Sequence, residues 1–321
     1  MLLSKIYEPV QEDLVKVEDS LKSVRQVDFP WLSEMVDYSL SGGGKRIRPA
    51  LTLLAGKFYD YNLESLLPMA VAVELMHTAT LVHDDAIDNS LVRRGKPTVN
   101  SVCGDDKAVL LGDYLFARAG EFATDTKNLP VVKLFTQTLA TISSGELSQI
   151  LSAFKLGQSR QDYLRRIAGK TASLFALATE SGAILSHAPE KAIRVLRDYG
   201  YNLGIAFQIV DDILDFAGTE ADLGKPVGSD LAQGTLTLPA MLLLERYPHD
   251  NPVDKLFRGE EREKNIARAL AMVGNSTIVE ECSRIVSEYC TRASQSLCDL
   301  PDNATRQSLT QMAEYFAVRK K

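Results

Sequence analysis

The chain has 321 residues, of which 45% are hydrophobic and 24% charged, an ordinary balance for a globular protein that buries a sizeable core. Its formal net charge is -6 and no long run of Lys and Arg forms a basic surface, which argues against nucleic-acid binding. No apolar run approaches the roughly 18 residues that a membrane span needs, and the N-terminus lacks the pattern of a secretory signal. We therefore expect a cytoplasmic protein with one domain over residues 1–321.

Apolar residues recur at three and four positions along most of the chain, which is the spacing of amphipathic helices, and strand signals are scarce. A first helix carries an apolar stripe from Leu14 to Val24, and a longer stripe begins at Leu66. Turn signals rich in Gly, Pro and Asn separate the helical segments. The pattern predicts an all-α fold. Later helices are predicted over residues 131–151, 172–186, 192–216 and 278–298.

Two DDxxD clusters, Asp84–Asp88 and Asp211–Asp215, interrupt apolar helical segments. The spacing places the first and last Asp of each cluster one turn apart on a single helical face. Stacked carboxylates repel one another, and burial without a counter-charge raises their pKa until they are neutral. Mg²⁺ supplies that charge, because it takes oxygen ligands and is usually completed by water and substrate phosphates. One such cluster is as readily a solvated helix face, but two copies framed by apolar residues favour a metal site that receives a polyphosphate.

Basic and polar side chains surround both clusters. The segment Ser41–Pro49, SGGGKRIRP, joins three glycines, which let the backbone approach a ligand, to three cations. It lacks the spacing of a Walker A loop, so nucleotide triphosphate hydrolysis gains no support. Each cation is unremarkable alone, but together they favour diphosphate binding. The candidates in chain order are Lys45, Arg48, His77, Arg93, Arg94, Lys170, Thr171, Gln208 and Lys225.

Over roughly residues 20–300 these motifs, in this order, resemble those of the trans-isoprenyl diphosphate synthases, also called polyprenyl synthetases. The motifs are GGGKRIRP, HDDAIDNSLVRRGKPT, GKTASLF, FQIVDDILDF and DLGKPVGSDLAQGTLTLP. The resemblance implies a helical bundle around a deep central cavity, a homodimer, and about three Mg²⁺ ions held by the two aspartate motifs.

The resemblance also assigns roles by position. Isopentenyl diphosphate is expected to bind Lys45, Arg48, His77 and Arg94. The allylic diphosphate is expected near Arg93, Lys170, Thr171, Gln208 and Lys225. Metal ligation falls to Asp84, Asp88 and Asp211, while Asp85, Asp212 and Asp215 complete the motifs, more often through water or neighbouring groups. One departure is Thr235, which stands where many relatives have a lysine.

The implied reaction needs no protein nucleophile. An allylic diphosphate such as geranyl, farnesyl or geranylgeranyl diphosphate ionises with help from Mg²⁺ and the nearby cations, and isopentenyl diphosphate adds to the carbocation. We expect Asp84, Asp88, Asp211, Lys170 and Arg93 to act at this step. The alternatives are a short-chain farnesyl or geranylgeranyl diphosphate synthase, a terpene cyclase, or an inactive partner subunit of a heteromeric synthase.

Product length is expected to depend on the helix before the first motif. The residues predicted to line the hydrocarbon route are Val73, Met76, Ala79 and Thr80. In short-chain relatives an aromatic side chain occupies one of the two positions that match Ala79 and Thr80, and here both are small. We therefore expect an all-trans product longer than C20. Phe135, Leu139 and Ile142 are candidates for the floor of the route.

Overall fold

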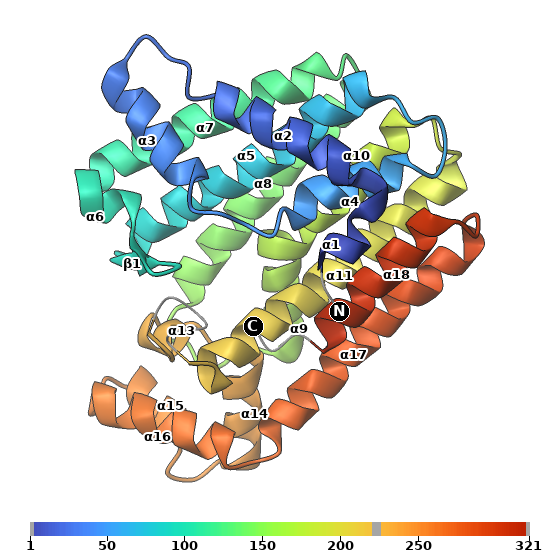
Figure 1. Ribbon diagram of the computed structural model, residues 1–321. Helices are drawn as coiled ribbons and strands as arrows, with labels where there is room; N and C mark the ends of the chain where they lie inside the picture. The colour runs from blue at the N-terminus through green and yellow to red at the C-terminus, as the bar shows by residue number, and fades with distance from the viewer. Residues whose placement is uncertain (1–2, 220–225, 319–321) are drawn as a thin grey trace.

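The computed structural model describes residues 3–219 and 226–318, and within them the chain is helical except for one short hairpin (Figure 1). This confirms the predicted all-α class. The α-helices are α1 (Leu3–Ile6), α2 (Gln11–Ser23), α3 (Pro30–Leu40), α4 (Ile47–Gly56), α5 (Leu63–Ile87), α6 (Val99–Cys103), α7 (Asp105–Asp125), α8 (Leu129–Ser152), α9 (Arg160–Ile167), α10 (Ser173–Leu185), α11 (Glu190–Ala217), α13 (Ser229–Ala232), α14 (Leu238–Arg246), α15 (Pro252–Phe257), α16 (Arg262–Gly274), α17 (Ile278–Ser296) and α18 (Ala304–Ala317). Shorter helical turns are η1 (Glu8–Val10), η2 (Ala168–Ala172) and η3 (Leu297–Asp299), and the strands are β1 (Val92–Arg93) and β2 (Lys96–Pro97).

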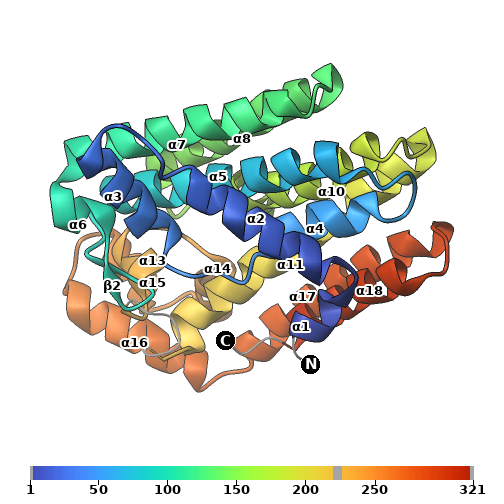
Figure 2. The same cartoon turned by 45° about the horizontal axis from the view of Figure 1, so that its top comes forward.

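The four later helices predicted from apolar spacing correspond to α8, α10, α11 and α17, with ends that differ by a few residues at most. The buried residues form one core cluster that extends from Ile6 on α1 to Phe316 on α18. In Figure 2, α7 and α8 lie along one edge of the bundle, and α17 and α18 lie together on the opposite side of α11.

Helices α5 and α11 form the centre of the bundle and carry the two aspartate motifs. The side chain of Asn62 caps α5 by accepting a hydrogen bond from the backbone N–H of Glu64 at 2.9 Å. α5 packs against α4, α7 and α10, while α11 packs between α10 and α17. Each motif lies near the C-terminal end of its helix, where free carbonyl groups add partial negative charge. That position increases the need for cations at both motifs.

Helix α5 is long and apolar enough to cross a membrane, with a mean hydropathy of 1.5 over its most apolar window. The sequence-based expectation that no segment reaches this length was therefore wrong, because one charged residue, Glu74, does not outweigh its apolar neighbours. However, 67% of that window is buried inside the fold. α5 is the central core helix of this structure, and it is the one helix among the described residues that meets the length and hydropathy criteria.

The hairpin β1–β2 was not predicted from the sequence. Its two strands pair antiparallel, with Arg93 opposite Lys96, and Arg94 and Gly95 form the two-residue turn between them. Both turn residues have positive φ, 51° at Arg94 and 74° at Gly95, as a type I′ turn requires. Arg93 therefore lies on strand β1 and Arg94 in the turn, so that the two adjacent side chains point in different directions.

Candidate active site

The three carboxylates of the first motif have different surroundings at the end of α5. Asp84 and Asp88 are partly exposed, and the backbone N–H of Asp88 closes the last helical turn on the carbonyl of Asp84 at 2.8 Å. Asp85 is buried, and both of its carboxylate oxygens accept hydrogen bonds from Nε of Arg93 at 2.8 Å. Burial raises the pKa of Asp85, and the Arg93 guanidinium opposes that rise. Asp84 and Asp88 thus face the solvent side, whereas Asp85 anchors an arginine.

Lys170 lies between two acidic side chains from different helices. Its Nζ is 3.5 Å from Oδ2 of Asp84 and 2.6 Å from Oε2 of Glu146, on α8. Burial lowers the pKa of Lys170, but these carboxylates raise it, and the balance is a rise. Glu146 was not among the predicted residues. A weak signal existed in the sequence, because Glu146 is the one acidic residue in the otherwise uncharged stretch from residue 134 to 152.

Lys170 and Thr171 lie in η2, a single turn of π-helix that the sequence did not predict. A π-helical turn inside a run of α-helix often marks a functional position. α8 approaches η2 closely: a Cβ at Gly145 would lie 3.0 Å from the backbone nitrogen of Lys170, so a larger residue there would displace this turn. The glycine lets Glu146 and Lys170 meet.

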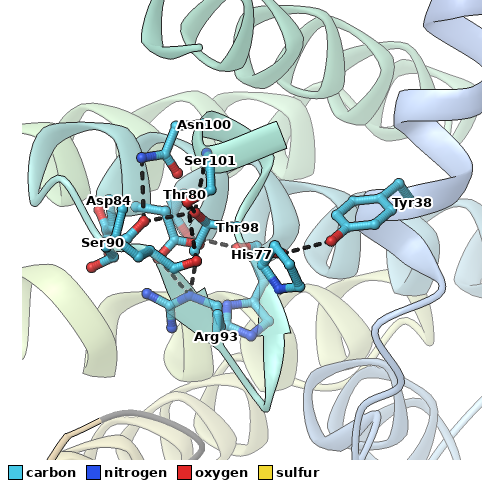
Figure 3. Close-up of polar contacts among 12 residues, drawn as sticks. Tyr38, His77, Thr80, Asp84, Ser90, Arg93, Thr98, Asn100 and Ser101 are labelled. Atoms are coloured by element: carbon cyan, nitrogen blue, oxygen red, sulfur yellow. Dashed lines mark hydrogen bonds and ion pairs between the residues drawn. The ribbon is translucent and has the colours of Figure 1, made fainter. Parts of the chain in front are cut away.

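The hairpin places Arg93 and Arg94 over a pocket between α3 and α5. Thr98 Oγ1 and Asn100 Nδ2 donate to the carbonyl of Ser90 at 2.6 and 3.2 Å. These bonds fix the segment between α5 and β1, from which the hairpin begins. Figure 3 shows these residues gathered around Ser90, with Arg93 below them and Tyr38 reaching in from α3. The pocket's charged and polar lining residues include Arg46, Glu74, His77, Asp85, Arg93, Arg94 and Lys96.

His77 lines this pocket as an uncharged imidazole. Burial, together with the positive charges of Arg48 and Arg94, lowers its pKa well below 6.5. A neutral imidazole offers one donor and one acceptor, so His77 can hydrogen-bond a phosphate oxygen without adding charge.

The glycine-rich loop positions its cations in three different environments. Arg46, at positive φ, donates to Oε1 of the buried Glu74 at 2.7 Å and also pairs with Glu18, so it is a structural arginine. Arg48 is buried, with its guanidinium 4.8 Å from the centroid of the Phe175 ring. Burial lowers the pKa of Arg48 to about 10. Lys45 is exposed, 5.8 Å from the Tyr315 ring centroid.

A buried glutamate links this loop to Arg94. Arg94 donates to the carbonyl of Gly43, and a Cβ at Gly44 would lie 3.7 Å from both Arg94 Nη1 and Glu74 Oε1. Glu74 acts electrostatically on Arg46, Arg48 and Arg94 together. The structure therefore brings His77 near Arg48 and Arg94, and also near Arg93, which the sequence had assigned to the other diphosphate. It adds Glu74, which sequence reasoning missed.

The second motif has buried carboxylates with neutral donors. Asp212 accepts hydrogen bonds from Tyr163 Oη at 2.6 Å and from Gln208 Nε2 at 2.8 Å. Gln208 Oε1 accepts in turn from Thr171 Oγ1 at 2.6 Å. Burial and the charge of Asp230 raise the pKa of Asp212 to about 7. Gln208 and Thr171 thus support Asp212 in this structure.

Asp215 is likewise buried and faces the N-terminal end of α13. Its Oδ1 accepts from Ser229 Oγ at 2.7 Å and its Oδ2 from the backbone N–H of Asp230 at 3.1 Å. Asp211, in contrast, is partly exposed. Because Asp85, Asp212 and Asp215 all bond to protein donors, a direct metal contact from these three stays a prediction, and the exposed positions are Asp84, Asp88 and Asp211.

The two motifs lie close enough to act on each other's surroundings. The negative charge of Asp230, beside the second motif, raises the pKa of Asp88 in the first, where burial is the larger cause. Asp211 in the second motif acts on Arg48 and Arg94, beside the first. The ends of the two acidic helices therefore lie within electrostatic reach of each other.

Oxygen donors and excess negative charge fit divalent cations at this place. Asp88 has its pKa raised by burial and by Asp84, a repulsion that a bound cation relieves. Across the described part of the chain, no group of three or more His, Cys, Asp or Glu side chains is arranged to hold a metal by protein ligands alone. The partly exposed carboxylates of Asp84, Asp88 and Asp211 are the oxygen donors that Mg²⁺ takes.

The remaining predicted residues are placed as follows. Lys225 lies outside the described residues. On α5, Val73, Met76 and Ala79 are fully buried, while Thr80 is partly exposed and donates to the His77 carbonyl at 2.7 Å. On α8, Phe135 and Ile142 are buried and Leu139 is half-buried. The hydrocarbon route and its floor stay predictions.

Comparison with known proteins gives one consistent result. The Polyprenyl synthetase family model matches residues 29–273. The chain is 37% identical over 320 residues to heptaprenyl diphosphate synthase component 2 from Bacillus subtilis (strain 168), covering 100% of this chain and 92% of that one. The polyprenyl synthase from Caulobacter crescentus CB15, solved in complex with calcium and isoprenyl diphosphate, superposes with a TM-score of 0.96 at 32% identity, covering 100% and 98% of the two chains. The heptaprenyl diphosphate synthase from Staphylococcus aureus superposes with a TM-score of 0.93 at 36% identity, covering 97% and 99%. The chain belongs to the polyprenyl synthetase family, in agreement with the resemblance found in its motifs.

Proposed function

We propose that this protein is a chain-elongating prenyltransferase that condenses isopentenyl diphosphate with an allylic diphosphate and releases a polyprenyl diphosphate longer than C20. The observation that carries the proposal is the ion pair of Lys170 with Asp84, which together with Asp88 lies beside a pocket lined by arginines on which Asp211 also acts. Oxygen ligands on two sides and cations around them form a receptor for two diphosphates. The relatives named as heptaprenyl diphosphate synthases support the product class.

The allylic diphosphate is placed between the two motifs, near Lys170 and Arg93. Bound Mg²⁺, about three ions by family resemblance, would neutralise the leaving diphosphate at Asp84, Asp88 and Asp211. Lys170, held by Asp84 and Glu146, keeps a positive charge at that position. We expect the bound substrates to shield the carbocation, so that it meets the second substrate before it is hydrolysed.

Isopentenyl diphosphate is placed in the pocket between α3, α5 and the hairpin. Arg94 and the neutral His77 face it, and Arg48 adds positive charge from behind. Lys45, on the exposed loop, completes the set. We expect the departing diphosphate to take the proton that is lost, and we assign no side chain to that step.

The direct test is incubation with farnesyl diphosphate, labelled isopentenyl diphosphate and Mg²⁺, followed by product sizing. We expect condensation and a main product longer than C20. A cyclic hydrocarbon formed without isopentenyl diphosphate would identify a terpene cyclase instead. If no allylic primer gave a product, the protein would be an inactive partner subunit. A product of fifteen or twenty carbons would identify a short-chain synthase.

Replacing Thr80 or Ala79 with Phe tests the predicted hydrocarbon route. Thr80 lies one turn before Asp84 and so projects toward the same face, and it is partly exposed. An aromatic ring there should block chain growth and shorten the product by several isoprene units. Ala79 is fully buried, so Ala79→Phe should shorten the product with a larger loss of stability. Unchanged product length in both folded variants would show that the chain runs elsewhere.

We also propose a cytoplasmic homodimer that associates through α7 and α8. Leu110, Leu147 and Leu151 are 67%, 60% and 70% exposed, and both helices lie at one edge of the bundle (Figure 2). Light scattering should show a dimer that Leu147→Glu converts to monomer, whereas Val15→Glu, on exposed α2, leaves it intact. Because a relative is named component 2, a monomer that gains activity only with a second protein would contradict the homodimer.

A further inference from the structure

A buried arginine stands beside the second aspartate motif and has no part in the reaction described above. Arg166, on α9, is 6% exposed. Its Nη1 donates to Gln158 Oε1 at 2.6 Å and its Nη2 to the Leu236 carbonyl at 2.5 Å. Its guanidinium lies 5.6 Å from the centroid of the Tyr163 ring, whose hydroxyl holds Asp212. Burying an arginine costs free energy unless nearby acidic groups offset the loss of hydration.

Those acidic groups come from three neighbouring elements. Burial lowers the pKa of Arg166, while Asp212 on α11, Asp230 on α13 and Glu146 on α8 raise it. Asp212 and Asp230 also repel each other, and Arg166 opposes the resulting rise in the pKa of Asp212. The guanidinium therefore serves as a shared counter-charge for the carboxylates on this side of the site.

Arg166 also contacts the loop that contains Thr235. The Leu236 carbonyl that accepts its hydrogen bond belongs to the residue after Thr235, and the backbone N–H of Thr235 donates to the Asp230 carbonyl at 2.8 Å. Helix α13, which precedes this loop, supplies Ser229 and Asp230 to Asp215. Thr235 itself is half-exposed and uncharged. The charge that balances this loop thus comes from α9.

We propose that Arg166 is a positioning residue that sets the charge balance of the second aspartate motif, so that this chain functions with an uncharged residue at position 235. The proposal rests on the proposed function in taking a metal diphosphate as the ligand. Removing the charge leaves Asp212 and Asp230 mutually repelled and the loop free to move, which weakens the metal–diphosphate complex. Because the backbone of Thr235 bonds the Asp230 carbonyl, a lysine at position 235 adds a positive charge to the same loop.

The test measures Mn²⁺ binding with inorganic pyrophosphate present, by electron paramagnetic resonance of free Mn²⁺. Arg166→Gln keeps an amide donor but loses the charge, whereas Arg166→Lys keeps the charge. We expect roughly tenfold weaker binding for Arg166→Gln and less than threefold for Arg166→Lys. Arg165→Met is the matched control, because Arg165 is on the same helix with its side chain 71% exposed, and binding should change less than twofold.

The decisive variant is Arg166→Gln with Thr235→Lys, in which binding should recover to within threefold of the wild type. Failure of that recovery in a folded protein, or equal binding by Arg166→Gln and the wild type, would overturn the proposal. Equal weakening by Arg166→Gln and Arg166→Lys would also overturn it, since geometry rather than charge would then matter. Urea unfolding without metal confirms that each variant folds. If Arg166→Gln does not fold, a loss of threefold or more in folded Arg166→Lys, which keeps the charge, would overturn the proposal. Wild-type condensation with farnesyl diphosphate tests the proposed function separately.

Discussion

The two aspartate motifs share one spacing and one position near the end of a long helix, yet the fold neutralises them differently. In the first motif, cations contact the carboxylates directly: Arg93 bonds Asp85 and Lys170 pairs with Asp84. In the second motif, Asp212 receives hydrogen bonds from neutral side chains, and the guanidinium of Arg166 lies behind them. A shared sequence pattern thus does not imply a shared electrostatic environment, because the environment comes from residues elsewhere in the chain.

The largest effect should follow from removing an exposed carboxylate of either motif. Asp84→Asn and Asp211→Asn should each lower kcat by roughly 10³-fold, since each deletes a charge that acts on the leaving diphosphate. Asp85→Asn should cost less, because Asp85 anchors Arg93. Steady-state assays with labelled isopentenyl diphosphate measure the three variants. An equal decrease in kcat for all three variants would contradict the proposed difference between exposed and buried aspartates.

A smaller effect, on stability, should follow from removing the cation of the first motif. Lys170→Met leaves Asp84 and Glu146 facing each other, and should lower the free energy of unfolding by about 2 kcal/mol without metal. The value is below that for a fully buried pair because 24% of the Lys170 side chain is exposed. Adding Glu146→Gln should recover part of the loss in urea unfolding. Equal stability of the single and double variants would contradict this account.

The smallest effect should come from one neutral donor of the second motif. Tyr163→Phe removes a hydrogen bond to the buried Asp212 and should lower the free energy of unfolding by about 1 kcal/mol. Lys170→Met should exceed it, because an unpaired charge costs more than one lost neutral hydrogen bond. Tyr201→Phe, at a 42% exposed tyrosine, is the matched control and should change stability by less than about 0.5 kcal/mol. If Tyr163→Phe destabilised the protein as much as Lys170→Met, the two motifs would not differ as proposed.

The sequence predicted the helices well and the site's partners only in part. Apolar spacing predicts α8, α10, α11 and α17 because burial along one helical face repeats locally. The β1–β2 hairpin and the π-helical turn η2 were missed, since both are single turns too short to leave a periodic signal. Glu146 and Glu74 were missed because one acidic residue in an apolar helix is only a weak signal, and its basic partners lie elsewhere in the chain.

By itself, the sequence determined the all-α class and the two DDxxD motifs, since each is encoded by residues a few positions apart. Its ordered motifs also determined the family. Only the tertiary structure decided which aspartates are exposed and which groups neutralise the others. Tyr163 and Asp212 are 49 positions apart, and Arg166 and Leu236 are 70 apart. Such pairs meet through the packing of α9 against its neighbours, and electrostatic balance depends on distances in space, which no local pattern in the chain records.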